Sequence, residues 1–493
     1  MRTFFLALLI SAPPLFATVC PPRVAAEPHV RKLRKWAGQA KPLGTPVAQH
    51  RQDLPVLIIG AGPAGLAMMR ELQDAGIPWE AVERWIEVGG VWAADNPESP
   101  AYPGLRSNSS YGTTHLGDPL PDEYPDFPSA PQLHAYLKDF AVRHGLRRGI
   151  EFNHSVESLE KQSDGSWCAT LRPGRALHRI HKCYRAVVVA SGSNSRSSAM
   201  FPAALFAKAQ AAKLSPIHGS YYRGPEPYAG KRVLVVGSGN TGGDIATEVS
   251  RVAKQTLFSA RTTPWLVPEY IFRNTRWEEP ADLFAQRRVP DFFYSLEMLA
   301  FRAIQKFAVG HPTRDLGLPA PIEHDILDRL PTVDRGLAEA LLEGRVLPRR
   351  GLVDFYGRRP VFHRGNREEP IDAVIFATGY HHGNFPFLPQ ELKEGAKEPA
   401  LWVFDRKEED LLYLYEVGVA QGVWPIFVDQ AKAATAYLKA QTAGTANYEL
   451  FREARTQTNP DFKGRRFRLA EPRFLDARRY SDYLHGFRFW IQE

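Results

Sequence analysis

A glycine-rich run, Gly-Ala-Gly-Pro-Ala-Gly at residues 60–65, follows directly on the apolar run 56–59. In this spacing Gly60 permits a tight turn, Gly62 lets a pyrophosphate approach the backbone, and Gly65 lets a helix pack closely against a strand. The free N–H groups at the start of that helix would attract the phosphates. The pattern therefore predicts a dinucleotide-binding turn between a strand and a helix.

An acidic residue stands where such a site needs one. The next apolar stretch begins at Trp79 and ends at Glu83, and a carboxylate at this place accepts hydrogen bonds from the adenosine ribose. The glycine pattern alone would be a weak indication. Strand, helix and acid together at this spacing favour a nucleotide site over a tight strand–helix turn without a ligand.

A second glycine-rich run, GSGNTG at residues 237–242, follows the apolar run 232–236. The strand expected after it, 256–258, is followed by Ser259 and Arg261 and by no acid. A carboxylate there would repel a 2′-phosphate, whereas a hydroxyl and a guanidinium would bind it. The second site is therefore predicted to prefer NADPH to NADH, and the alternative interpretation of Arg261 is a surface arginine without a ligand.

Two further apolar runs show how these sites are arranged. Residues 186–190 run into Ser191-Gly192, and residues 373–377 run into Thr378-Gly379, so that one such exit follows each glycine-rich cycle. Continuous apolar runs of this length are typical of buried parallel strands. We expect an α/β fold of two Rossmann-like dinucleotide-binding domains, one inserted into the other. The expected parts are residues 52–195 of the first domain, residues 196–379 of the inserted domain, and residues 380–493, which return to the first domain and form a C-terminal tail.

Five short motifs stand in a fixed order around these features. They are Gly89-Gly90-Val91-Trp92, Leu105-Arg106-Ser107-Asn108, His218-Gly219-Ser220-Tyr221-Tyr222, Ala377-Thr378-Gly379-Tyr380 and Phe385-Pro386-Phe387-Leu388. This order resembles that of the flavin-containing monooxygenases and covers about residues 52–440. The resemblance implies FAD in the first domain and NADPH in the inserted one, with the segment 377–380 linking the two.

The resemblance also implies roles for single residues. The segment 89–92 would lie over the flavin, Asn108 would lie beside the reactive edge of the flavin as the catalytic residue, and the loop at Gln421 would lie near the flavin. The residues expected at FAD are Gly60, Gly62, Ala64, Gly65, Glu83, Gly90, Trp92 and Gln421. Those expected at NADPH are Gly237, Gly239, Asn240, Thr241, Gly242, Ser259 and Arg261.

The activity that the resemblance implies is oxygenation of a small molecule with O2. NADPH would reduce FAD, the reduced flavin would form a C4a-hydroperoxide with O2, and an amine or a sulfide would take one oxygen atom. This chemistry needs few protein acids or bases, and the sequence shows no nucleophile–base pair. Three alternatives stay open: a Baeyer–Villiger enzyme acting on ketones, an NADPH oxidase or reductase, and a flavin-binding protein without turnover.

The sequence departs in part from the pattern that identifies the family, FxGxxxHxxxY. His218 and Tyr222 are kept, but Ala212 and Leu214 stand at the phenylalanine and glycine positions, which puts the subfamily in doubt. Baeyer–Villiger enzymes would carry tryptophan where Tyr222 stands. Because no nucleophile is placed to use His218, we interpret it as a structural residue that orients the link between the domains.

Composition and charge exclude several other classes. Of the 493 residues, 44% are hydrophobic and 24% charged, which is typical of a soluble protein with a sizeable core. The three cysteines, Cys20, Cys168 and Cys183, offer no CxxC pair, no metal-ligand spacing and no disulfide framework. This excludes the dithiol flavoprotein reductases. The net charge of +8 is scattered apart from an arginine-rich run at 465–479, so it suits an anionic cofactor and does not support nucleic-acid binding.

The N-terminus resembles a cleavable secretory signal, expected at residues 1–26. Arg2 precedes an apolar stretch, Phe4 to Phe16, and small residues follow at Val24-Ala25-Ala26. Residues 27–51 lack periodicity and are expected to form a linker or a wrapping arm. We therefore expect an exported protein, with an N-terminal membrane anchor as the alternative. Any membrane contact would come through this segment, and the sequence does not predict the oligomeric state.

Overall fold

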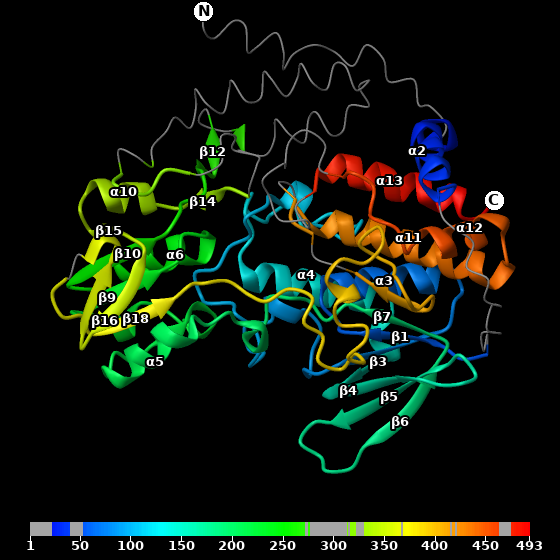
Figure 1. Cartoon of the computed structure of the whole chain (residues 1–493), viewed down its shortest axis with the longest axis horizontal. Helices are drawn as coiled ribbons and strands as arrows, with labels where there is room; N and C mark the ends of the chain where they lie inside the picture. Colours follow the sequence, from blue (N-terminus) through cyan, green and yellow to red (C-terminus); the bar gives the residue numbers. More distant parts are fainter. Residues whose placement is uncertain are drawn as a thin grey trace, which may run out of the picture.

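The computed structural model describes residues 22–39, 53–271, 275–276, 313, 316–321, 330–365, 368–414, 417–419, 422–462 and 475–493. Two sheets of five parallel strands form the centres of two lobes (Figure 1). The first sheet has the order β19-β7-β1-β2-β3 and the second β15-β10-β9-β18-β8. The first comprises β1 (Val56–Ile59), β2 (Trp79–Glu83), β3 (Ile150–Phe152), β7 (Ala186–Val189) and β19 (Leu411–Tyr413). The second comprises β8 (Ile217–His218), β9 (Arg232–Val236), β10 (Gln255–Ala260), β15 (Val346–Arg350) and β18 (Ala373–Phe376).

The inserted arrangement that the sequence predicts is confirmed by strand pairing. β19 pairs in parallel with β7, although every strand of the second sheet lies between them in the chain. Strands β1, β7, β9 and β18 are largely buried, as their continuous apolar runs indicate. The expected helix after the first glycine-rich run is α3 (Pro63–Asp74), which begins with proline because the missing N–H costs nothing there.

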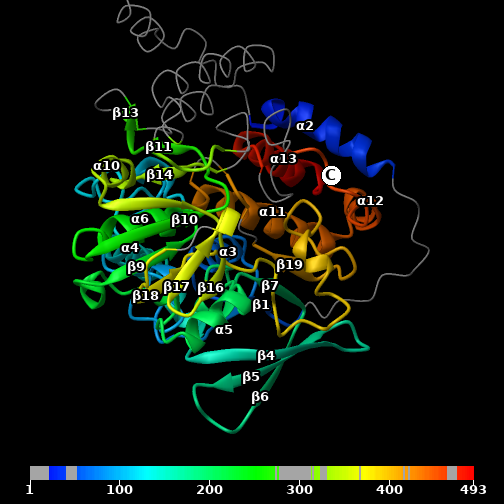
Figure 2. The same ribbon diagram turned by 60° about the vertical axis from the view of Figure 1, so that its left-hand side comes forward.

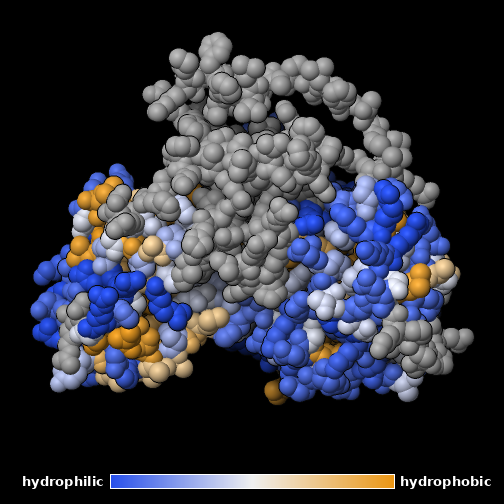
Figure 3. All heavy atoms as spheres, turned by 45° about the horizontal axis from the view of Figure 1, so that its top comes forward, coloured by the Kyte–Doolittle hydropathy of each residue, from blue (hydrophilic) through white to orange (hydrophobic). Residues whose placement is uncertain are grey.

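Helices cover both sheets. In the first lobe α11 (Trp424–Ala443) packs on α3, and α4 (Ala130–Arg143) lies beside them. The other described helices are α5 (Ala203–Ala211), α6 (Asn240–Val249) and α10 (Leu337–Leu342) in the second lobe and α2 (Pro22–Ala37), α12 (Ala446–Ala454) and α13 (Ala477–Trp490) in the first. None of these helices is both long and apolar enough to cross a membrane. On the face that Figure 3 shows, hydrophilic residues cover most of the described surface of the first lobe.

The prediction that residues 27–51 form a linker without regular structure is wrong for their first part. These residues belong to helix α2, which packs against α13 (Figure 2). Val30, Leu33 and Ala37 of this helix are buried in the core of the first lobe. Arg34 pairs with Glu493 at 2.7 Å. The three buried residues follow a helical spacing, which the many basic residues between them obscured.

A small antiparallel sheet of β4 (His154–Lys161), β5 (Trp167–Pro173) and β6 (Ile180–Tyr184) extends from the first lobe. Cys168 and Cys183 stand directly opposite each other in β5 and β6, with their Cα atoms 4.0 Å apart, and form a disulfide. The expectation that the cysteines form no disulfide was therefore wrong. Only the strand register brings the two together, and the sequence did not reveal that register.

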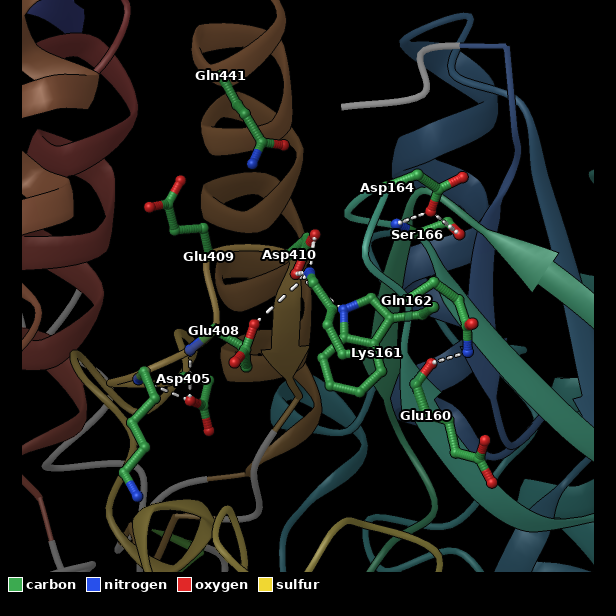
Figure 4. A network of polar contacts seen from close by, with 12 residues as sticks. Glu160, Lys161, Gln162, Asp164, Ser166, Asp405, Glu408, Glu409, Asp410 and Gln441 are labelled. Atoms are coloured by element: carbon green, nitrogen blue, oxygen red, sulfur yellow. Dashed lines mark hydrogen bonds and ion pairs between the residues drawn. The ribbon is translucent and has the colours of Figure 1, made fainter. Parts of the chain in front are cut away.

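One buried carboxylate joins this small sheet to the main sheet. Asp410, which is fully buried, pairs with Lys161 and accepts a hydrogen bond from Trp167 Nε1 at 2.8 Å (Figure 4). Its own backbone oxygen accepts from Val187 N of β7 at 2.8 Å.

Three short two-stranded pairs complete the described part of the fold: β11 (Leu266–Pro268) with β14 (Thr332–Asp334), β12 (Tyr270–Ile271) with β13 (Thr275–Arg276), and β16 (Leu352–Tyr356) with β17 (Arg359–Phe362).

Candidate active site

A pocket opens at the carboxyl ends of the strands of the first sheet, which is where open α/β sheets bind ligands. Segments that follow β1, β2, β7 and β19 line it, together with the start of α11. Its lining residues are Gly60, Gly62, Pro63, Ala64, Glu83, Arg84, Gly90, Val91, Trp92, Asn96, Glu98, Ser99, Ala190, Ser191, Gly192, Ser193, Asn194, Ser195, Leu414, Val423, Trp424 and Phe427. Six of the residues predicted at FAD are among them, and a seventh, Gly65, packs beneath the loop.

The three glycines of the first loop have different tasks. Gly60 has φ +107°, and a Cβ there would lie 2.6 Å from Ala190 O. A Cβ at Gly65 would overlap Gly60 O, whereas a Cβ at Gly62 would meet only the backbone of Gly90, with Cα at 3.6 Å and N at 4.0 Å. Gly60 and Gly65 are therefore required by the fold itself, while Gly62 borders the open pocket at the N-terminus of α3. This cradle fits the pyrophosphate of a dinucleotide.

Glu83 lies at the pocket with both carboxylate oxygens engaged. They accept from Ala61 N and from Trp85 N, each at 2.8 Å. Burial raises the pKa of this carboxyl above its ordinary value, and the two N–H donors oppose that rise. Each oxygen keeps lone-pair capacity, so the geometry is compatible with the predicted hydrogen bonds to a ribose.

The other end of the pocket is aromatic. Trp92 makes an edge contact with Trp424, with ring centroids 6.1 Å apart, and Trp424 stacks on Tyr136 at 5.9 Å. A flat ring system such as a flavin fits among such side chains. Sequence reasoning found Trp92 but missed Trp424 and Phe427, because they come from a helix more than 300 residues further along the chain.

The second glycine loop repeats the construction of the first. Gly237 has φ +123°, and a Cβ there would overlap Ala377 O at the exit of β18. A Cβ at Gly239 would meet no atom within 4 Å, so this glycine, like Gly62, borders open space. The side chain of Asn240 is engaged inside the domain, since its Oδ1 accepts from Val333 N at 2.7 Å.

The residues expected to bind the 2′-phosphate divide into two kinds. Ser259 is 1% exposed and its hydroxyl accepts from Leu352 N at 2.9 Å, so its expected contact with a phosphate does not fit this structure. Arg261 is exposed at the end of β10. Arg350, which lies opposite Ala260 on β15, is also exposed and pairs with no acid in the described part of the chain. Spacing along the chain did not indicate Arg350, because it comes from another strand.

Asn108 stands outside the pocket lining, on the loop that leads from the first lobe toward the second. It is exposed, and its Oδ1 accepts from Arg335 Nη1 at 3.0 Å. Gln421 lies outside the described residues. Its neighbour Gly422 packs so closely on this loop that a Cβ would overlap Thr113 O.

His218 is buried beside the two chain segments that cross between the lobes. Its Nδ1 accepts from Ser220 N, and its Nε2 donates to Gly379 O, each at 3.1 Å. Burial lowers the pKa of His218 to about 4, so the ring is neutral near pH 7 and both nitrogens are satisfied. Gly379 O also accepts from Met200 N of the other crossing segment at 2.9 Å. These contacts agree with the structural interpretation of His218.

Comparison with known proteins identifies the family. Residues 54–408 match the model of the flavin-binding monooxygenase-like proteins. The chain belongs to this family. It is 30% identical to human flavin-containing monooxygenase 5 over 350 residues, which are 69% of this chain and 64% of the human one. It is 32% identical to mouse dimethylaniline monooxygenase [N-oxide-forming] 4 over 357 residues, which are 69% of this chain and 60% of that one. The chain thus spans less than two thirds of the length of these two relatives.

The fold is also similar to that of a solved structure. The open crystal structure of cyclohexanone monooxygenase superposes with a TM-score of 0.56 and 17% identity, covering 80% of this chain and 90% of that one. At this identity the likeness concerns the fold.

The second and third glycines of the first loop, Gly62 and Gly65, give a matched test of the cofactor cradle. Gly62→Ala should fold normally, since the new methyl meets ordinary contacts, but should retain little flavin because the methyl occupies the place of the pyrophosphate. Gly65→Ala should lose thermal stability as well, because its methyl overlaps Gly60 O. Flavin absorbance per protein and the melting temperature separate the two effects. A Gly62→Ala protein that keeps its full flavin content would show that the pyrophosphate binds elsewhere.

Proposed function

We propose that this chain is an FAD- and NADPH-dependent monooxygenase that inserts one oxygen atom from O2 into a soft nucleophile, an amine or a sulfide. The observation that carries the proposal is the pair of glycine loops, which are built alike on the two sheets. The strand that follows the first loop, β2, ends in an acid, Glu83, whereas the strand that follows the second loop, β10, ends without one. When bound, FAD would supply the reaction with O2 and NADPH the hydride.

The residues of the chain would bind and orient the cofactors and shield the flavin from water. Gly62 and the N-terminus of α3 would hold the pyrophosphate of FAD, and Trp92 and Trp424 would keep water from the ring end of the pocket. The amide of Asn108 can donate hydrogen bonds to an oxygen atom and accept from a hydroxyl. No general acid or base of the protein is needed in this scheme.

An amine or a sulfide is preferred to a ketone as substrate for two reasons. The mouse relative at 32% identity is named for N-oxide formation. In addition, Tyr222 stands where the Baeyer–Villiger enzymes would carry tryptophan, and its hydroxyl donates to Glu248 Oε2 at 2.8 Å.

The proposal is tested by following NADPH loss and product together with a panel of tertiary amines, sulfides and cyclic ketones. We expect amines or sulfides to gain one oxygen atom, with close to one product formed per NADPH consumed. Lactones from ketones would point to the Baeyer–Villiger alternative instead. NADPH loss that yields only hydrogen peroxide would indicate an oxidase, and a bound flavin that NADPH cannot bleach would indicate a protein without turnover.

The preference for NADPH should depend on Arg261. Arg261→Ala should raise the KM for NADPH by about 10- to 150-fold, the effect of losing one hydrogen bond to a charged group, and should leave the KM for NADH nearly unchanged. Arg251→Ala, which removes an exposed arginine after the end of α6, is the control and should change neither. Equal effects of Arg261→Ala on the KM for both coenzymes would show that Arg261 does not bind the 2′-phosphate of NADPH.

We also propose that the chain works in an oxidising compartment, after export through residues 1–26, with an N-terminal anchor as the alternative. The cross-strand disulfide Cys168–Cys183 supports this, because such bonds persist in secretory and extracellular proteins. Protein recovered from a secretory compartment should begin near Glu27, and its two cysteines should resist thiol labelling until they are reduced. A chain that keeps residues 1–26 and in which Cys168 and Cys183 are both free thiols would contradict export.

A further inference from the structure

Arg335 crosses from the inserted domain to the loop that carries Asn108. It stands between β14 and α10, and its side chain is 8% exposed. Within its own domain Nε donates to Glu269 Oε1 at 2.7 Å, and Nη1 lies 3.3 Å from Asp244 Oδ2. Across the domain boundary Nη2 donates to Ser107 O at 2.5 Å and Nη1 to Asn108 Oδ1 at 3.0 Å. One planar guanidinium thus joins two acids of one domain to two acceptors of the other.

This contact fixes which way the Asn108 amide faces. A guanidinium has only donors, so the amide atom that faces Arg335 must be the oxygen. The Nδ2 group therefore faces away, and it donates to no residue in the described part of the chain. The side chain of Asn108 is exposed, which leaves both N–H groups free for a ligand.

We propose that Arg335 is a positioning residue of the monooxygenase reaction, which holds the Asn108 amide so that its N–H groups donate to the reacting cofactor. This inference rests on the proposed function. It adds a residue that neither the glycine loops nor the motif around Asn108 indicates, because Arg335 belongs to a different domain from Asn108.

The inserted domain holds Arg335 through its own nucleotide loop. β14 is tied to that loop at two points, since Thr332 Oγ1 donates to Ser238 O at 3.0 Å and Val333 N donates to Asn240 Oδ1 at 2.7 Å. Two residues after Val333 the chain reaches Arg335. The orientation of Asn108 therefore depends on the same loop that would hold the pyrophosphate of NADPH.

Arg106 provides a matched control. It also binds Glu269, with Nη2 3.0 Å from Oε1, and it also spans the two domains, but its side chain is 42% exposed and makes no hydrogen bond to Asn108 among the described contacts. Arg106→Gln and Arg335→Gln each remove one cation from the same carboxylate. Only the second removes the donor to the Asn108 amide.

The test combines these variants with Arg335→Lys, which keeps the charge but lacks the planar fork that reaches several acceptors at once. Arg335→Lys and Arg335→Gln should lower the product formed per NADPH by about tenfold and raise hydrogen peroxide correspondingly, the effect of losing one hydrogen bond to a charged group. Arg106→Gln should change this ratio by less than about twofold. Backbone amides of residues 107–110 should exchange with deuterium faster in the Arg335 variants than in the parent or in Arg106→Gln.

A background of Asn108→Ala separates positioning from general support of the interface. There the added change Arg335→Lys should alter the product formed per NADPH by less than about twofold. An equal loss in both backgrounds would overturn the inference, as would an Arg335→Lys protein with the coupling and deuterium exchange of the parent. If the parent itself oxygenates no amine or sulfide, the proposed function fails, and the deuterium exchange still decides whether Arg335 holds this loop.

Discussion

Both nucleotide loops depend on a place where two backbones come closer than a side chain would allow. Gly60 lies against Ala190 O, and Gly237 lies against Ala377 O, so that each tight turn is pressed onto the exit of the strand next to it. The following helix then begins directly over the carboxyl end of the sheet, with its free N–H groups at the pocket. A single methyl group at either glycine would separate turn and strand, and with them the phosphate cradle.

The two lobes meet through polar contacts and through apolar packing, in which Tyr102 of the first lobe is buried in the core of the second against Tyr222. Two crossing segments run side by side, joined by hydrogen bonds from Met200 N to Gly379 O and from His381 N to Ser198 O. The neutral ring of His218 braces Gly379 from within the inserted domain. The position of the inserted domain is thus set by directional bonds together with the buried side chain of Tyr102.

The first lobe is complete only when distant parts of the chain come together. After the inserted domain the chain returns to add β19 to the sheet, and α11 then brings Trp424 into the pocket beside Trp92. Asp410, at the start of β19, anchors the small disulfide-bonded sheet through Lys161. At the far side α2 packs its buried residues against α13, so residues near both ends of the described chain share one core.

The sequence by itself determined the two glycine loops, the strands that flank them, the acid after the first cycle and its absence after the second. These features follow from the backbone freedom of glycine and from the order of apolar runs, both of which are local. The tertiary structure alone decided which distant side chains meet. It buried the hydroxyl of Ser259 and brought Arg335 to Asn108. Other examples are Trp424 at the pocket, Arg350 beside Ala260, the disulfide Cys168–Cys183 and the docking of α2. Such contacts depend on strand register and on the packing of segments hundreds of residues apart, for which spacing along a chain carries no information.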